Sequence, residues 1–201
     1  MLLVPFFTEI SMTGRSLPTT LVLSLAATAA LAQMPAPAAS TAAPAVELKV
    51  GDVAPAFKLQ ASDGKTYSLA DYKGKSAVVI AWFPKAFTSG CTIECKSLAE
   101  KGDLIKAYKA AYFMASVDPV DGEQGNKAFA ETHKADFPLL SDPTKEVAAA
   151  YGVLSPRGFA TRWTFYIGAD GRITAIDKAV RPATSAEDMA TKLGELNTPK
   201  K

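Results

Sequence analysis

Cysteine and histidine are scarce in this sequence of 201 residues, which contains two Cys and one His. Two cysteines cannot build a scaffold of several disulfides, and with one histidine they cannot supply the four protein ligands of a structural zinc site. The net charge is also small, because the 22 Lys and Arg residues are nearly balanced by 20 Asp and Glu residues, and the basic residues are not clustered in the sequence. Nucleic-acid binding driven by phosphate neutralisation is therefore not expected.

Three further kinds of site are missing from the sequence: a glycine-rich phosphate loop, a pair of catalytic carboxylates and a Ser-His-Asp set. We therefore expect no nucleotide, flavin, haem or obligatory metal. The composition is otherwise that of a globular protein, with 48% hydrophobic and 21% charged residues, and it excludes a disordered or collagen-like chain. The length favours one domain with an adequate core.

The first 32 residues have the pattern of an export signal. Arg15 provides a positive charge, and residues 21–32 are an apolar run too short to span a bilayer as a helix. Ala30 and Ala32 give the small-x-small pattern of a cleavage site before Gln33. Because residues 1–11 lack basic charge, Met12 is the alternative start. A buried N-terminal core helix is the less favoured interpretation.

Residues 33–45 are rich in Ala and Pro and predict an extended linker, followed by a single domain over residues 46–197. No cysteine stands at the cleavage site, so no lipid anchor is indicated. The signal predicts an exported protein, periplasmic in a Gram-negative cell, with no membrane span in its mature form.

Hydrophobic periodicity and turn residues predict the elements of this domain. Residues 77–83 and 111–117 are continuous apolar runs, typical of strands buried on both faces, and the helical spacing of residues 92–109 between them predicts a parallel crossover. The other expected elements are hairpins at 56–60 with 65–69 and at 163–167 with 173–176, and helices at 125–134, 145–151 and 185–196. The order predicts an α/β fold with a central mixed sheet flanked by helices.

The junction between the strand at 77–83 and the following helix carries the chemistry. Cys91 is expected in the first turn, where the helix dipole favours the thiolate, which is the nucleophilic form, and a nearby Arg would add to this effect. Gly90 permits close approach of a substrate to the backbone. The Thr88 hydroxyl can both donate to and accept from a small oxygen substrate.

Pro84, Thr88 and Cys91 match the motif Pro-x-x-x-Thr/Ser-x-x-Cys, and the chain resembles the peroxiredoxins of the AhpC/TSA superfamily at this motif. Residues 50–57, 116–118 and 137–142 are similar to further motifs of the peroxiredoxin Q branch, also called bacterioferritin comigratory protein. Arg162, just before a hydrophobic strand, stands where that family keeps its active-site Arg. The resemblance spans about residues 46–196.

This resemblance implies a thioredoxin-like fold with an N-terminal hairpin extension, and reduction of hydrogen peroxide or organic hydroperoxides. Cys91 would be the peroxidatic cysteine and become sulfenic acid. Arg162 would hold the thiolate and polarise the peroxide, Thr88 would hydrogen-bond the peroxide oxygens, and Pro84 would shield the site from water. The partners would be the peroxide and a thioredoxin-like or other thiol reductant, and the protein a monomer or weak dimer.

Cys95 departs from the branch, in which a resolving cysteine on the same helix commonly lies five residues after the first, because here the separation is four. Side chains at i and i+4 have Cβ atoms about 5–6 Å apart, whereas a disulfide needs about 3.5–4.5 Å. Our hypothesis is that Cys95 resolves the sulfenic acid after the first turn unwinds. The alternatives are a small buried residue without a redox role and a static disulfide.

The C-x-x-x-C spacing on such a fold also resembles copper-delivering proteins of the Sco family, since two thiolates and a histidine bind copper. The only histidine, His133, precedes the position of the Sco ligand and is interpreted as a solvated helix residue; Thr92 also stands where Sco proteins usually have Pro. Copper binding is the second candidate function. A thiol-disulfide reductase is less favoured, because that role normally uses C-x-x-C.

The remaining conspicuous side chains have structural interpretations. Five aromatic residues are expected in the core or the cleft wall: Trp82, Phe83, Phe87, Trp163 and Phe165. Glu94 is expected to interact favourably with the helix dipole. Asp118 and Asp142 are expected to cap or turn the chain, or to orient Arg162.

Overall fold

Seven strands form one mixed sheet in the computed structural model, which describes residues 47–201. The predicted signal peptide and linker, residues 1–32 and 33–45, lie outside the described residues. The strand order is β2-β1-β5-β4-β3-β6-β7. The strands are β1 (Lys58–Ala61), β2 (Thr66–Ser68), β3 (Ala77–Trp82), β4 (Ala110–Ser116), β5 (Leu139–Ser141), β6 (Thr164–Ile167) and β7 (Ile173–Asp177).

The middle of the sheet is the parallel pair β3 and β4, flanked by β6, antiparallel to β3, and β5, parallel to β4. Side chains of β3 alternate between the two faces, and each face is buried. Val79 and Ala81 join one hydrophobic cluster, whereas Val78, Ile80 and Trp82 join the other. The apolar run of residues 77–83 is therefore needed to fill two cores at once.

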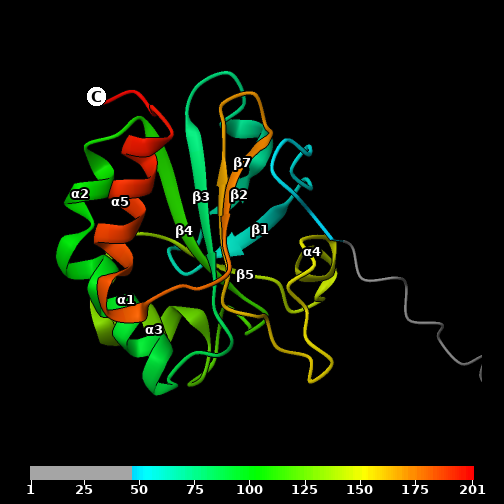
Figure 1. Ribbon diagram of the computed structural model, residues 1–201. Coiled ribbons are helices and arrows are strands. Elements are labelled where there is room, and N and C mark those ends of the chain that lie inside the picture. Colours follow the sequence, from blue (N-terminus) through cyan, green and yellow to red (C-terminus); the bar gives the residue numbers. More distant parts are fainter. Residues whose placement is uncertain (1–46) are drawn as a thin grey trace, which may run out of the picture. The chain divides into compact units, whose positions relative to one another are not determined.

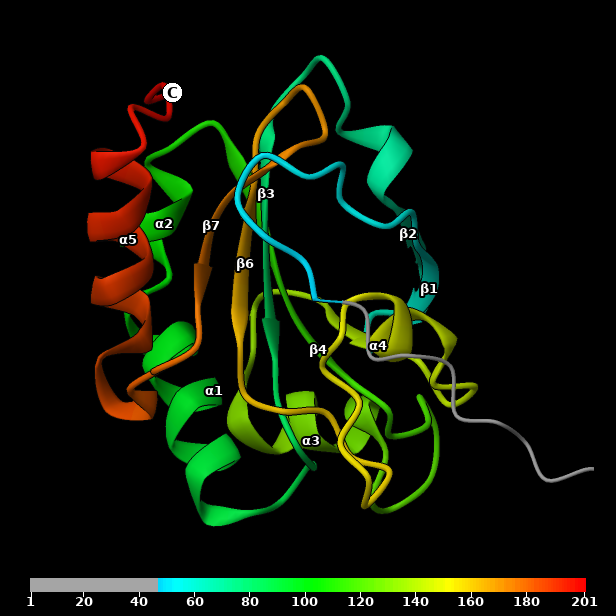
Figure 2. The same cartoon turned by 45° about the vertical axis from the view of Figure 1, so that its right-hand side comes forward.

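Helices cover both faces of the sheet (Figures 1 and 2). On one face lie α1 (Ser89–Lys101), α2 (Asp103–Lys106), α3 (Asn126–His133) and α5 (Ser185–Glu195), which contribute to the cluster that contains both cysteines. On the other lies α4 (Glu146–Ala150), and side chains of β1 and β2, at the edge of the sheet, contribute to the same second cluster. Short 3-10 helices, η1 (Leu69–Asp71) and η2 (Pro182–Thr184), complete the described part.

This architecture confirms the predicted α/β class, the central mixed sheet and the two hairpins, with ends that differ by one or two residues. Two predictions were wrong in detail. The expected helix at 92–109 begins earlier, at Ser89, and is divided at Gly102, where a Cβ atom would lie 2.4 Å from Tyr112 Oη and 2.5 Å from the Leu98 carbonyl oxygen. Strand β5 was not predicted, because three residues carry no periodicity of their own.

Among residues 47–201, no helix has both the length and the apolar character that crossing a membrane requires.

Candidate active site

The loop that joins β3 to α1 places the predicted cysteine at a helix N-terminus. Thr88 is the N-cap residue, and the first intrahelical hydrogen bond runs from the Thr92 amide to the Thr88 carbonyl oxygen, at 2.9 Å. The amides of Gly90 and Cys91 therefore precede the hydrogen-bonded ladder of the helix. This arrangement puts the Cys91 sulfur in the positive end of the helix dipole.

The Cys91 sulfur lies beside Arg162, which comes from the segment just before β6. Arg162 Nη2 donates to Cys91 Sγ over 3.1 Å, and Arg162 Nη1 donates to the Glu94 carboxylate. Cys91 and Glu94 are fully buried, whereas the Arg162 side chain is 19% exposed. One guanidinium thus bridges a buried sulfur and a buried carboxylate, and a positive charge in contact with the sulfur stabilises a thiolate.

Glu94 is the residue of this site that the sequence did not reveal. Burial raises the pKa of its carboxyl to about 7, and the facing Arg162 only partly opposes this rise. The Ser185 hydroxyl, at the start of α5, donates to the other carboxylate oxygen over 3.5 Å. Burial disfavours the charged form of Arg162, but Glu94 and Cys91 hold the pKa of Arg162 above its ordinary value. The guanidinium therefore stays charged.

The absence of a side chain at Gly90 leaves space for the Arg162 guanidinium. A Cβ atom on this residue would lie 3.2 Å from Arg162 Nη2, closer than ordinary van der Waals contact. The glycine predicted to allow substrate approach therefore also allows Arg162 to reach the sulfur.

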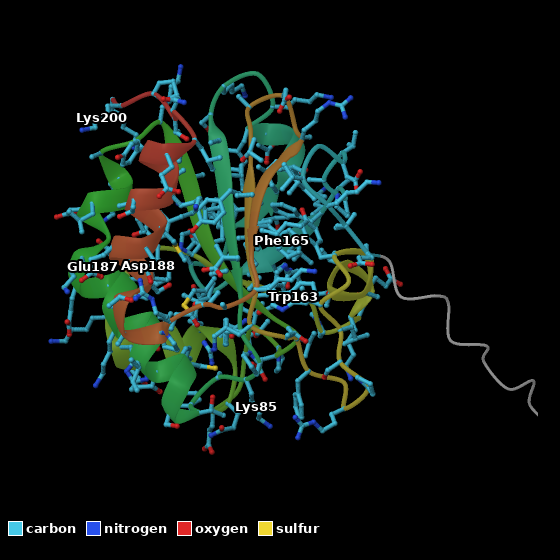
Figure 3. All side chains as sticks on the ribbon, in the orientation of Figure 1. Lys85, Trp163, Phe165, Glu187, Asp188 and Lys200 are labelled. Carbon is cyan, nitrogen blue, oxygen red and sulfur yellow. The ribbon has the colours of Figure 1, made fainter. Side chains whose placement is uncertain are left out.

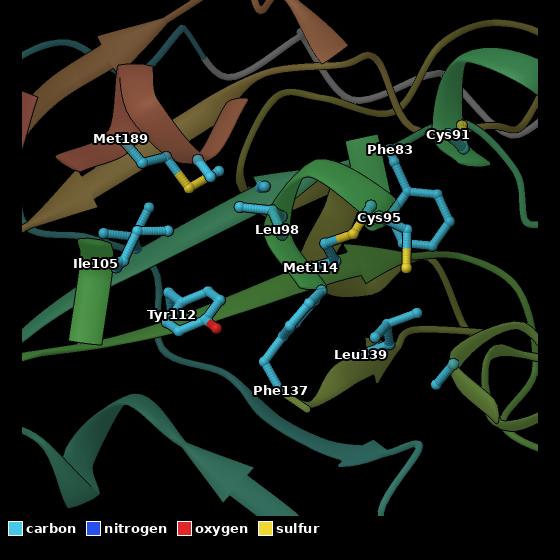
Figure 4. Close-up of a cluster of buried hydrophobic side chains, with 14 of the residues drawn as sticks. Phe83, Cys91, Cys95, Leu98, Ile105, Tyr112, Met114, Phe137, Leu139 and Met189 are labelled. Carbon is cyan, nitrogen blue, oxygen red and sulfur yellow. The ribbon is translucent and has the colours of Figure 1, made fainter. Parts of the chain in front are cut away.

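Cys95 lies one turn below Cys91 and faces the core. Figure 4 shows it among Phe83, Leu98 and Met114, which belong to the same buried cluster. Burial, with smaller contributions from the charges of Glu94 and Cys91, raises the pKa of the Cys95 thiol to about 12. Both cysteines are free thiols, so the alternative of a static disulfide does not describe this structure.

The structure places the other predicted site residues, Pro84 and Thr88, on the same loop, whereas the side-chain hydrogen bond to the sulfur comes from Arg162. Pro84 is half-buried directly after β3. Thr88 is exposed, and its hydroxyl donates to the Lys85 carbonyl oxygen over 2.9 Å, which leaves its oxygen able to accept from a ligand. Between them Phe87 has a left-handed backbone with φ 62°.

The aromatic residues form the core and the walls around this loop, as predicted. Trp82, Phe83 and Phe165 are fully buried, whereas Phe87 and Trp163 are partly exposed. Figure 3 shows Phe165, which belongs to β6, and Trp163, which directly precedes that strand, with Lys85 at the lower end of the described part.

Two interpretations of charged or titratable residues were wrong. Glu94 does not serve the helix dipole; it is buried against Arg162. The prediction that Asp142 caps the chain is confirmed, because it accepts the Ala148 amide near the start of α4 over 2.7 Å. Asp118 accepts the Ala86 amide over 2.8 Å. The alternative role of these carboxylates, orienting Arg162, is filled by Glu94.

The second wrong interpretation concerns His133, which is not a solvated residue. It is half-buried, and its ring meets the Phe129 ring edge-on with centroids 4.7 Å apart. The Nε2 atom is buried without a hydrogen-bond partner. Among residues 47–201, no three His, Cys, Asp or Glu side chains gather into a group that could hold a metal ion.

Comparison with known proteins gives the family. The model of the AhpC/TSA family matches residues 50–176. Peroxiredoxin Bcp of Escherichia coli is 35% identical over 133 residues, which cover 63% of this chain and 83% of that protein. Chloroplastic peroxiredoxin Q of Triticum aestivum is 39% identical over 131 residues, which cover 63% of this chain and 58% of that protein.

A crystal structure of peroxidoxin BcpB from Mycobacterium tuberculosis superposes with a TM-score of 0.65 at 29% identity, and the match covers 75% of this chain and 97% of that one. These relatives do not favour the copper-binding alternative. The chain belongs to the AhpC/TSA family and to its peroxiredoxins, which are thiol-dependent peroxidases.

Proposed function

We propose that this peroxiredoxin reduces hydrogen peroxide and organic hydroperoxides with Cys91 as the attacking residue. The contact between Arg162 Nη2 and Cys91 Sγ, at 3.1 Å, carries the proposal. Within residues 47–201, Arg162 is the only arginine whose guanidinium donates to a cysteine. The acceptor is Cys91, the cysteine at the N-terminus of the helix, and not Cys95. A fixed positive charge beside the sulfur stabilises the thiolate, and it also stabilises the negative charge that develops on the peroxide during the attack.

In the first step the Cys91 thiolate attacks one oxygen of the peroxide. A sulfur–oxygen bond forms while the oxygen–oxygen bond breaks, so the sulfur is oxidised by two electrons and the peroxide is reduced. The leaving oxygen departs as hydroxide or alkoxide and takes up a proton to become water or alcohol. Arg162, together with the free amides at the start of α1, lies where it can stabilise the developing negative charge. The Thr88 oxygen can accept a hydrogen bond from the peroxide.

The second step is disulfide formation with Cys95, which attacks the sulfenic acid and releases water; a dithiol reductant of the thioredoxin type then reduces the disulfide. In the folded helix Cys95 is unreactive, because its raised pKa keeps it a thiol and it faces the core. Unwinding of α1 from its N-terminus through Cys95 would expose Cys95 to water and remove both obstacles. The same burial that protects Cys95 thus makes unwinding a requirement.

The test is stopped-flow oxidation of the reduced protein by hydrogen peroxide, followed by fluorescence of Trp82 and Trp163. Oxidation at least ~10²-fold faster than that of free cysteine is expected, which is the size of effect that one fixed donor at a developing charge provides. Cys91→Ser should abolish the reaction. If the reduced protein reacts no faster than free cysteine, the proposal is wrong.

Cys95→Ser is the matched test of the second step. The variant should still be oxidised at Cys91, but mass spectrometry should find sulfenic or sulfinic acid in place of a disulfide, and turnover with a dithiol should slow. Turnover at the full wild-type rate would remove Cys95 from the mechanism.

We also propose that the protein works outside the cytoplasm, on the support of the apolar segment at residues 21–32 and the small residues Ala30 and Ala32. Mass spectrometry of the protein purified from cells that produce the full chain should find an N-terminus at Gln33, in the periplasmic fraction. An intact N-terminus in the cytoplasmic fraction would contradict the proposal.

A further inference from the structure

The loop between β3 and α1 is held in a conformation that it would not adopt alone. Phe87 has φ 62°, a left-handed backbone that is unfavourable for a residue with a Cβ atom. The loop leads directly into the turn that carries Cys91. Contacts from outside the loop must therefore fix it, and two of those that the structure shows are made by consecutive residues, Ala86 and Phe87.

The first contact is a hydrogen bond from the Ala86 amide to Asp118 Oδ2 over 2.8 Å. Both partners are buried, Ala86 to 1% and Asp118 to 8% exposure. Asp118 follows β4, 32 residues later in the chain, so the bond ties the loop to the neighbouring strand. A carboxylate that accepts a backbone amide away from water forms one of the stronger hydrogen bonds in a protein.

The second contact is made by the neighbouring residue, because the Phe87 ring packs edge-on against the Phe129 ring of α3, with centroids 5.2 Å apart. The loop is thus fastened by a polar contact on one side and by an aromatic contact on the other.

Asp118 is itself rigidly held. The Ser116 hydroxyl donates to Asp118 Oδ2 over 3.0 Å, and the Asp118 amide donates to Ser116 Oγ over 3.1 Å. Asn126, at the start of α3, donates to Ser116 Oγ over 3.1 Å and to Ser141 Oγ of β5 over 2.8 Å. The carboxylate that holds the loop is thereby joined to two strands and a helix.

We propose that Asp118 is a positioning residue that controls the two steps of the reaction in opposite directions, an inference that rests on the function proposed above. By holding Ala86 it keeps the first turn of α1 wound and Cys91 beside Arg162, which favours attack on the peroxide. The same bond opposes the unwinding that brings Cys95 to Cys91, so it slows disulfide formation. Asp118 touches neither peroxide nor sulfur and acts only through the loop.

Three variants separate this role from a general loss of stability. Asp118→Ala removes the acceptor, whereas Asp118→Asn keeps an oxygen that can accept from the Ala86 amide. Asp142→Ala is the matched control, because Asp142 is also a buried carboxylate that accepts a backbone amide, from Ala148 over 2.7 Å, but its carboxylate does not contact the loop.

The first measurement is hydrogen–deuterium exchange of the reduced protein without peroxide. In Asp118→Ala, exchange of peptides spanning residues 84–92 should rise about 10- to 100-fold, as expected for loss of one buried hydrogen bond to a charged group. Asp118→Asn should recover most of the protection, and Asp142→Ala should leave these peptides unchanged. Unchanged exchange in Asp118→Ala, or an equal rise in Asp142→Ala, would overturn the proposal.

The second measurement is stopped-flow kinetics of the same proteins. Asp118→Ala should slow oxidation of Cys91 by hydrogen peroxide by about tenfold and speed the following disulfide formation. A purely structural defect would slow both steps, which would refute the opposing effects. If Asp118→Ala does not fold, Ser116→Ala, which removes a donor to Asp118, takes its place. This variant should also oxidise more slowly at Cys91 and form the disulfide faster, with smaller changes in both rates. The exchange measurement needs no peroxide, so failure of the peroxidase proposal and failure of the positioning proposal are separate results.

Discussion

Replacing Glu94 with glutamine is expected to stabilise the protein at neutral and alkaline pH relative to the wild type. The carboxyl of Glu94 is fully buried, and burial raises its pKa from 4.5 to about 7. Glutamine has the same shape and keeps an oxygen that can accept from Arg162 Nη1, but it never ionises. The variant therefore behaves like the protonated form of Glu94.

The sign and the size follow from this difference in pKa. Below pH 4.5 the carboxyl is protonated in both the folded and the unfolded chain. Between pH 4.5 and about 7 the unfolded chain releases the proton while the folded protein retains it, so the free energy of unfolding falls as the pH rises. The full difference corresponds to about 3 kcal/mol, and Glu94→Gln should not show this loss.

The assay is urea unfolding of reduced wild type and variant at several pH values from about 3 to 8.5, followed by tryptophan fluorescence. Other titrating groups are common to both proteins and cancel in the difference. Glu187→Gln is a matched control of opposite sign, because the hydrogen bond from Lys101 lowers the pKa of Glu187. The Glu187 carboxylate adds to the free energy of unfolding at pH values above its pKa in the unfolded chain, and this contribution is lost as the pH falls.

The opposite result has an equally definite meaning. If Glu94→Gln loses stability relative to the wild type as the pH rises, then the attraction between Glu94 and Arg162 exceeds the cost of burying the carboxylate. The reasoning from burial would then be refuted.

Three further outcomes are expected at and near the site. Arg162→Lys, which replaces a planar fork by a single ammonium, should slow oxidation of Cys91 by hydrogen peroxide by ~10²-fold in stopped-flow measurements, and a wild-type rate would show that the contact at 3.1 Å is dispensable. Gly90→Ala should slow the same step while the urea midpoint changes little, because the added Cβ would lie 3.2 Å from Arg162 Nη2; equal rates would show that the guanidinium adapts without cost. His133→Gln should lose less stability than the wild type between pH 7.5 and pH 5.5, because burial and Lys96 lower the pKa of His133, so the unfolded wild-type chain takes up the proton at a higher pH than the folded protein; parallel curves would contradict this.

The elements that fill two cores were predictable from the sequence, and those fixed by distant contacts were not. Strands β3 and β4 are continuous apolar runs whose burial on both faces is visible in their composition. Strand β5 has only three residues, and its place comes from pairing with β1 and β4. The need for glycine at position 102 depends on Tyr112, which comes from the next strand.

The candidate site divides in the same way. Thr88 and Cys91 lie in one short motif, so spacing alone places them at the helix start. The partnership of Arg162 with Glu94 joins residues 68 positions apart, and only the fold creates it. A sequence signal did exist, because Glu94 follows Cys91 by three residues and therefore shares its helix face. The bond from Ala86 to Asp118 had no comparable signal.

Because Cys91 is buried, the oxidation state of its sulfur affects the stability of the whole fold. Its side chain belongs to the cluster that joins α1, α3 and α5 to the sheet. Sulfinic acid at this position would add two oxygen atoms to a fully buried side chain in a packed cluster, and it would not revert on its own. An over-oxidised molecule would then be less stable as well as inactive, and cellular proteases remove molecules that unfold more often. Damage to the sulfur would in this way limit the lifetime of the damaged protein.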